Sequence, residues 1–518
     1  MNDRLEAYAS AWQTAHRRLY EHLCATTKDK PHATLEDLQP LYQAIAHGCH
    51  AGLQQEARHE VYAARILRGK EYYSAKKLGA FGSELGAVAC FFETPWSRVS
   101  PALTKGDQAW LLNEAATRLR ALGRLTEALE PMRAGLEMYL KQEHWEFGSR
   151  LAGNLSELEL TLGDVAGAVR DAELSMTYAD RSGDAFLRMA FRTTLADVLH
   201  QAGSGLGFPS GSAFGSRSLE LFREAEQMQA ESQPEHPLLY SLWGFRYCDL
   251  LMVETERTAW QATLDCSRLL PLWASQPAAN AVGAMTKLRL AAEPTGDEAL
   301  SQSDASGLAT ESGSGLQQSK TLHAVIQRAT QALKISARNN WLLDIALDHL
   351  TLGRAAMHAA ILNSADISIL KLQLEAARSE IDQAVSGLRR SGQQHELPRG
   401  LLTRAWLLSL CGLHSGPDSA QSDLDEAWEI AERGPMPLFL ADILLYRVRL
   451  FGRLLKEDGE SRGHGDGQTQ TAYPWGSVEA DLAEARRLIV KHGYGRRLPE
   501  LQDAEAALSC SRPCLRLT

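Results

Sequence analysis

Few residues of this 518-residue chain are spaced for chemistry, and a phosphate-binding loop is the first possibility. Gly69 and Lys70 stand together, but Ala64 occupies the position of the glycine five residues earlier, and Glu71 follows where Ser or Thr would bind magnesium. A phosphate loop needs those glycines for its backbone cradle and the hydroxyl for the metal ion. The sequence therefore predicts no nucleotide site, and no other pattern in it predicts a bound cofactor.

Histidines near the N-terminus come closest to a metal site. His59 and Glu60 begin the pattern of a zinc-protease helix, but the second His of that pattern would fall at Ala63. His47 and His50 would share one face of a helix, where His59 could join them. Because no carboxylate or second Cys is spaced to complete four ligands, polar side chains around a helix end are the expected structure, with no metal.

Catalytic patterns are missing as well. No serine lies in a Gly-x-Ser-x-Gly nucleophile elbow. Glu157 and Asp197 could pair as acid and base, but on repeated helices such side chains more often face solvent or a ligand. Tryptophans such as Trp110 and Trp243 fit packing better than a cofactor pocket. We therefore expect no catalytic residue and a protein that is not an enzyme.

Composition narrows the possible partners and location. The chain is 44% hydrophobic with a net charge of −10, and an acidic balance argues against nucleic acid, whose binders must neutralise phosphates. A basic stretch near the end is flanked by Glu484 and Glu500 and is expected to be a solvated helix face: Arg486, Arg487, Lys491, Arg496 and Arg497. The apolar runs are short and interrupted, and the cysteines are scattered, which predicts a cytoplasmic protein without a membrane span.

The elements that must position any site are helices, and they repeat. Gly123, Gly163 and Gly203 stand 40 residues apart, and each follows an amphipathic run and precedes a second helix. A glycine just past a helix supplies the left-handed residue that closes the turn. The pattern predicts an all-α fold, an α-solenoid of antiparallel helix pairs with essentially no strand.

These helix pairs resemble the tetratricopeptide repeat. Its small and large apolar positions are matched in the first pair by Ala116, Leu119, Ala128 and Met132. Two features depart from that repeat, since the period is longer and Leu119 replaces the usual aromatic residue. The resemblance implies a right-handed superhelix whose concave side binds a protein or peptide.

Composition along the chain suggests how the helices are divided. Gly/Ser-rich or weakly apolar stretches mark the boundaries, and insertions between helices cost little stability. The expected organisation is an N-terminal helical region at 1–100, repeats at 101–293 with an insert at 203–218, a flexible linker at 294–320, C-terminal repeats at 321–508 with a disordered insert at 458–476, and a tail at 509–518.

Several strings go beyond the generic repeat, among them Leu119-Arg-Ala-Leu-Gly-Arg-Leu and Asp180-Arg-Ser-Gly-Asp. Others lie at 19–23, 38–50, 77–82, 154–158, 193–197, 244–251 and 397–402. Together they resemble the C-terminal helical-repeat region of bacterial NACHT/STAND-type signal-transducing NTPases, which are often linked to a TIR domain. The effector and ATPase of those proteins are absent here. The resemblance implies a sensing or autoinhibitory arm for an NTPase or effector domain, either in the same chain or in trans.

Two other functions stay open beside this one. A free-standing scaffold or adaptor of the same fold needs no NTPase, and an all-helical enzyme would need an unrecognised site. If the first helix of each pair lines the concave side, the positions left facing a ligand groove can be counted back from the closing glycines. They are Trp110, Asn113, Thr117, Arg120, Arg150, Glu157, Leu160, Thr193, Asp197 and His200.

Overall fold

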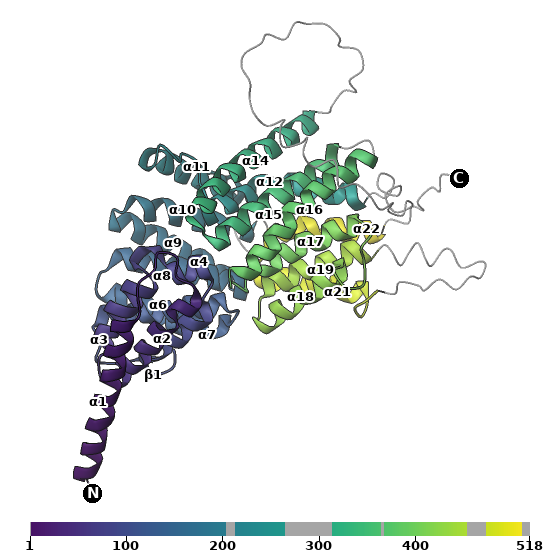
Figure 1. Cartoon of the computed structure of the whole chain (residues 1–518). Coiled ribbons are helices and arrows are strands. Elements are labelled where there is room, and N and C mark those ends of the chain that lie inside the picture. Colours follow the sequence, from purple (N-terminus) through teal and green to yellow (C-terminus); the bar gives the residue numbers. More distant parts are fainter. Residues whose placement is uncertain (1, 204–212, 265–312, 364–366, 453–472, 510–518) are drawn as a thin grey trace, which may run out of the picture.

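The computed structural model describes residues 2–203, 213–264, 313–363, 367–452 and 473–509, and within them the chain is built almost wholly of helices (Figure 1). Seven successive helix pairs form the body: α6 (Lys105–Ala121) with α7 (Leu125–Lys141), α8 (Trp145–Leu162) with α9 (Val165–Ser182), α10 (Ala185–Ala202) with α11 (Ala213–Ser232), α12 (Ser241–Leu264) with α14 (Gly313–Asn339), α15 (Leu342–Asn363) with α16 (Ile367–Arg390), α17 (Leu397–Leu410) with α18 (Ala420–Arg433), and α19 (Pro437–Phe451) with α21 (Val478–His492). A short 3₁₀ helix, η3 (Gly495–Arg497), and α22 (Leu498–Ser509) follow.

The N-terminal region packs on the first pair and is less regular. It contains α1 (Asn2–Thr26), α2 (Leu35–His50), α3 (Gln54–Glu56), η1 (Ala57–Ile66), η2 (Gly69–Glu71), α4 (Tyr73–Leu78) and α5 (Phe81–Ala89), then the strands β1 (Phe92–Thr94) and β2 (Arg98–Val99). The strands pair antiparallel, with Phe92 opposite Val99, and are the one piece of sheet among the described residues. The element η1, in the region predicted to be helical, is a π-helix. The N-terminal part of α1 projects away from the body (Figure 1), while its C-terminal part packs on α2.

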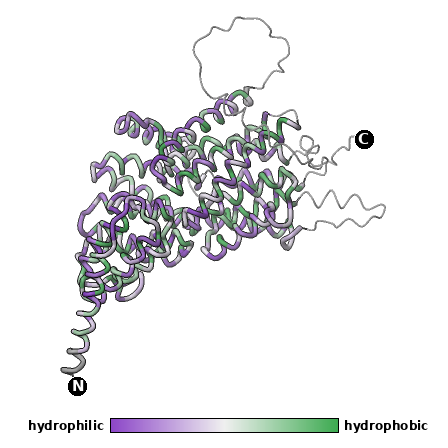
Figure 2. Tube along the Cα trace, viewed as in Figure 1, coloured by the Kyte–Doolittle hydropathy of each residue, from purple (hydrophilic) through white to green (hydrophobic). Residues whose placement is uncertain are grey.

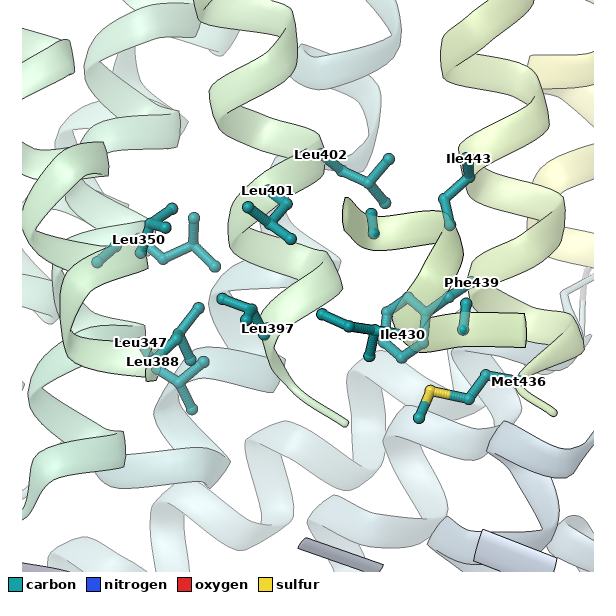
Figure 3. Close-up of a cluster of buried hydrophobic side chains, with 14 of the residues drawn as sticks. Leu347, Leu350, Leu388, Leu397, Leu401, Leu402, Ile430, Met436, Phe439 and Ile443 are labelled. Carbon is teal, nitrogen blue, oxygen red and sulfur yellow. The ribbon is translucent and has the colours of Figure 1, made fainter. Parts of the chain in front are cut away.

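The predicted solenoid of helix pairs is confirmed, and its repeat positions are core positions. Ala116, Leu119, Ala128 and Met132 are fully buried between α6, α7 and their neighbours. Each helix alternates apolar and polar faces along the tube (Figure 2), which is the pattern that drives helices to pack in layers. Figure 3 shows the apolar side chains of α15, α16, α17, α18 and α19 meeting in one such core.

Three predicted boundaries are corrected by the helices. Helix α11 already begins at Ala213, so the insert expected at 203–218 is shorter, and its residues 204–212 lie outside the described residues. Helix α14 begins at Gly313, which removes the end of the linker expected at 294–320. In the stretch expected to be disordered at 458–476, Trp475 donates a hydrogen bond to Asp425 at 2.6 Å and packs on the core. None of the described helices is both long and apolar enough to cross a membrane.

The solenoid winds back on itself, so that its last pairs lie against its first. The phenol of Tyr494 donates to the carbonyl of Leu160 at 3.0 Å, and Nδ1 of His492 lies 2.9 Å from the carbonyl of Gly163. The backbone N–H of Gln394 donates to the carbonyl of Ala121 at 2.7 Å. These contacts join the carboxyl ends of α6 and α8 to residues about 270 to 330 positions later in the chain. We call this line of contacts, at 121–124, 160–163 and 201–203 against 390–395, 434–436 and 492–497, the seam.

The glycines spaced 40 residues apart all lie in the seam. Gly163 (φ +91°) closes α8, and a Cβ built on it would lie 2.2 Å from Nδ1 of His492. Gly203 (φ +57°) follows α10, and its Cβ would lie 2.2 Å from the backbone N of Arg496. These two glycines therefore end a helix and also make room for the second turn of the solenoid, which occupies the space that a side chain would need. Gly123, in a looser contact, would bring its Cβ to 3.6 Å from Gln394.

A buried carboxyl in α15 should make stability depend on pH. Asp348 is 3% exposed and accepts a hydrogen bond from Ser336 at 2.8 Å, while burial and the nearby Asp344 raise its pKa from 3.8 to about 8. A carboxyl with a raised folded-state pKa stabilises the fold fully below its unfolded pKa, and that contribution is lost as pH rises from about 4 to about 8. Asp348→Asn keeps the shape and cannot ionise.

We therefore expect Asp348→Asn to be more stable than the native chain at pH 9, by an amount that disappears near pH 4. Urea unfolding at both pH values measures the difference, and Glu429→Gln, at an exposed site on α18, is the matched control. If the stability of the Asn variant has the same pH dependence as that of the native chain, ionisation of Asp348 does not destabilise the folded protein.

Candidate functional site: a central cavity

The closed solenoid surrounds a cavity at its centre, with a free volume of about 80 Å³. Its wall comes from α8, α10, α12, α15, α17 and α19, which are the first helices of six pairs, and from η3 and α22. Leu350, Leu402 and Phe439 supply part of its apolar lining and also belong to the core in Figure 3. The inner face of the solenoid therefore holds a small, partly open cavity.

Charged side chains dominate the polar part of the wall. Four arginines line the cavity, Arg354, Arg399, Arg496 and Arg497, together with five carboxylates, Asp197, Asp249, Glu256, Asp442 and Glu500. Three further groups pair with them directly, namely Arg246 with Asp197, Arg449 with Glu500, and Glu396 with Arg399. Six arginines thus face six carboxylates, and the cluster carries no net charge.

One chain of ion pairs runs from the seam into the wall. Arg120 contacts Glu157 at 2.7 Å, Arg246 contacts the same carboxylate at 2.6 Å, and Arg246 reaches Asp197 at 3.4 Å. Burial alone would raise the pKa of Glu157, but the guanidiniums of Arg246 and Arg120 lower it to about 2. Arg120 also donates to His395 across the seam at 3.3 Å. Glu157 is therefore held as an ionised structural partner of Arg246 and Arg120, and Asp197 contacts Arg246 as well.

A second group of charges joins α12 to α15 and η3. Arg354 donates to Asp249 at 2.8 Å and to Glu256 at 2.6 Å. Arg496 approaches the same two carboxylates but stays 3.6 and 4.0 Å away. Burial raises the pKa of Asp249, yet Arg496 and Arg354 hold it well below its ordinary value. At the other end, Arg497 pairs with both oxygens of Asp442 at 2.8 and 2.9 Å.

The structure brings together five of the ten residues predicted to face a groove. Leu160 and Asp197 line the cavity, and Arg120, Glu157 and His200 stand behind its wall in the ion-pair network. His200 is buried with its Nε2 3.7 Å from Asp249.

The other five lie elsewhere. The Trp110 ring is covered by the N-terminal region, with Tyr62 edge-on at 5.8 Å and the Arg58 guanidinium 4.2 Å above it. Thr193 is fully buried and bonds its own helix. Asn113 accepts a hydrogen bond from the side chain of Asn154. The last two residues bind within their own helices: Thr117 donates to the Glu114 carbonyl, and Arg150 pairs with Glu146.

The basic stretch near the C-terminus is not one solvated face, which corrects the expectation from sequence. Arg486 and Arg487 are exposed and pair with Glu505 and Glu484, as a solvated helix would have them. Arg496 and Arg497, by contrast, enter the cavity wall with only 12% and 5% of their side chains exposed. Closure of the solenoid buries them.

Most of the cavity's charged residues were missed from sequence, although a signal was available. Arg246 and Asp249 stand in the string at 244–251, and Arg399 stands at 397–402, both of them apolar helical runs. A charge inside an apolar helical run has to find a buried partner, because an unpaired buried charge is costly. That signal identifies buried charges, but it does not say which distant charge is the partner.

The histidines considered for a metal have other partners. His59 contacts Asp107 at 3.1 Å, and Nδ1 of His47 lies 2.8 Å from Nδ1 of His16 on α1. The rings of His16 and His50 are 4.9 Å apart. Among the described residues, no group of three or more His, Cys, Asp or Glu is arranged to hold a metal ion. The close pair Cys510 and Cys514 lies outside the described residues.

Comparison with known proteins adds little to these observations. No protein-family model matches the chain, and no curated protein matches it. One similar solved structure is described as "Circular tandem repeat protein with novel repeat topology and enhanced subunit contact surfaces"; it shares 13% identity and covers 97% of each chain, with a TM-score of 0.16. A TM-score that low carries no argument. The chain is an all-α solenoid of helix pairs on the strength of its own packing.

Proposed function

We propose that this chain is a non-catalytic protein-interaction module and the ligand-sensing arm of a NACHT/STAND-type signalling NTPase, which it contacts through α1. The small size of the inner cavity supports an outer docking surface for a protein. The observation that carries the proposal is an apolar stripe on α1. Tyr8, Trp12 and Leu19 expose 71%, 50% and 45% of their surface, and the N-terminal part of the helix projects from the body (Figure 1).

The stripe has the composition of a helix-docking surface. Its residues recur at intervals of four and seven, which places them along one side of the helix. The Trp12 ring packs edge-on against His16, with the ring centres 4.4 Å apart. This contact restricts the ring, so that it loses little conformational entropy on binding. Large exposed aromatic residues gathered on one element are typical of interaction sites rather than of ordinary surface.

One charge beside the stripe favours one kind of occupant. Arg18 is exposed on the flank of the stripe and forms no ion pair with any described residue. An amphipathic helix of the NTPase with acidic residues along its flank would cover the apolar stripe and pair with Arg18. We therefore assign α1 to an acidic-flanked helix of the NTPase, and the resemblance of the strings at 119–125 and 180–184 supplies the identity of that partner.

The test uses the NTPase specified by coding sequence adjoining that of this chain. Adding the purified chain should change its rate of ATP hydrolysis, and Tyr8→Asp with Trp12→Asp should weaken binding roughly 100-fold, because two aromatic anchors of about 1–2 kcal/mol each are replaced by charges. Val490→Asp is the matched control, since Val490 is 50% exposed on α21. Titration calorimetry and hydrolysis rates measure both effects.

Two results would contradict the proposal. Equal binding by the native chain and the double variant would remove α1 as the docking surface. Adjoining coding sequence that specifies no NTPase would favour the other function of this fold, a free-standing scaffold.

A further inference from the structure

The central cavity contains an arginine that has no hydrogen bond to the described residues. Arg496 of η3 is 12% exposed, and its nearest carboxylate oxygens, on Asp249 and Glu256, lie 3.6 and 4.0 Å away, beyond hydrogen-bond range. Its Nε is buried without a partner. Buried donors in native proteins are nearly always satisfied, so an orphaned guanidinium on a cavity wall points to a group that occupies the cavity.

A second guanidinium presents donors to the same space. Arg399 of α17 uses its Nε to bond Glu396 at 2.6 Å, and its two terminal nitrogens form no hydrogen bond with the described residues. The aromatic rings of Phe439 and Phe245 lie 5.3 and 5.8 Å from it and fix the position of the guanidinium. Arg399 lines the cavity and its side chain is 32% exposed, so the guanidinium is accessible to a small ligand.

Carboxylate oxygens without a hydrogen bond border the cavity as well. Oδ2 of Asp249 lies 3.6 Å from Arg496 and 3.7 Å from His200, both too long for a hydrogen bond. Glu256 receives Arg354 through Oε2 alone among the described residues. The wall therefore offers donors for an anionic group and acceptors for a cationic one.

Neutrality and size define the ligand further. The surrounding cluster balances six arginines against six carboxylates, and adding net charge beside so many buried charges would be costly. A free volume of about 80 Å³ is the space of roughly three waters at about 30 Å³ each, so the ligand must be as small as the smallest α-amino acids.

We propose that the central cavity binds a small α-amino acid as its zwitterion. The ligand carboxylate lies between the guanidiniums of Arg399 and Arg496, and its ammonium lies at the free oxygens of Asp249 and Glu256. The assignment goes beyond the proposed function and does not depend on docking through α1. Because η3 and α12 both contribute, the occupied cavity ties the end of the solenoid to its middle and favours the closed seam.

The experiment titrates the full-length chain calorimetrically with glycine, L-alanine and L-serine in turn. We expect at least one to bind, and its N-acetyl and methyl ester derivatives, which lack one charge each, to bind at least tenfold more weakly. Arg399→Lys, which keeps the charge but loses the planar fork, should weaken the amino acid at least tenfold. Arg487→Lys, on the outer face of α21, is the control and should bind normally.

Three outcomes would overturn the assignment. They are no heat of binding with any of the three amino acids at 10 mM, equal binding of a derivative that lacks one charge, and unchanged binding by Arg399→Lys. Inorganic phosphate binding as tightly as the amino acid would identify a site for simple anions instead. Failure here leaves the α1 test untouched, since Trp12 and Arg399 lie on different elements and are assayed separately.

Discussion

Gly203→Ala is expected to open the seam. Its backbone has φ +57° and ψ −162°, a combination that costs other residues about 1–3 kcal/mol. Its new Cβ would lie 2.2 Å from the backbone N of Arg496 and 2.5 Å from the carbonyl carbon of Gly495. Because these are backbone atoms, no rotamer change relieves the overlap, and overpacking adds about 1–3 kcal/mol. We expect a loss of about 2–6 kcal/mol in the free energy of unfolding.

The same substitution at Gly183 separates the two contributions. Gly183 closes α9 with φ +70°, and a Cβ there would meet nothing within 4 Å. Gly183→Ala should therefore lose only the conformational part, about 1–2 kcal/mol. Urea unfolding measures both losses, and small-angle X-ray scattering should show a larger radius of gyration for Gly203→Ala alone. Equal losses with equal radii would show that the two turns of the solenoid do not press together at Gly203.

The repeated helix pairs could be predicted because their causes are local. An apolar residue at every third or fourth position identifies the buried face of a helix. A glycine that recurs after 40 residues marks the end of the first helix in each successive pair. The core positions of Ala116 and Leu119 could therefore be predicted from the local pattern alone. The same local reasoning missed the π-helix at 57–66, where propensity alone gives no reason to widen the turn.

The closed cavity could not be predicted, because it depends on small rotations summed over many repeats. Nothing near Leu160 indicates that Tyr494 will bond its carbonyl. For the same reason Arg496 and Arg497, with acidic residues close by in sequence, had the pattern of a solvated helix. Trp110 does not face a groove for a different reason, because Tyr62 and Arg58 of the N-terminal region cover its ring.

Arg118→Met is expected to destabilise the N-terminal half more than any single change of an exposed charge. Arg118 is 4% exposed and lies between two carboxylates, with its Nε 2.6 Å from Glu84 and its NH2 2.7 Å from Glu114. Those side chains are 0% and 1% exposed. Removing the cation that lies between them leaves two buried carboxylates without their direct partner, and breaking a buried pair in this way costs about 3–5 kcal/mol.

The control and the rescue show whether charge is the cause. Arg124→Met removes an arginine that is 43% exposed and paired with Glu127, and it should cost less than about 1 kcal/mol. Combining Arg118→Met with Glu84→Gln and Glu114→Gln removes all three charges, and should recover most of the lost stability because a neutral set of similar shape has no ion left to desolvate. Urea unfolding of the four proteins makes the comparison.

The pH dependence of Arg118→Met has a defined sign. Burial and Glu84 already raise the pKa of Glu114 to about 7, against the opposing effect of Arg118. Without the arginine that pKa rises further, so the folded state binds more protons than the unfolded state above about pH 4.5 and stability falls as pH rises. The loss should therefore be smaller at pH 5 than at pH 8. A loss that is the same at both values, and that persists in the triple variant, would show that Arg118 stabilises the core by packing and not by its charge.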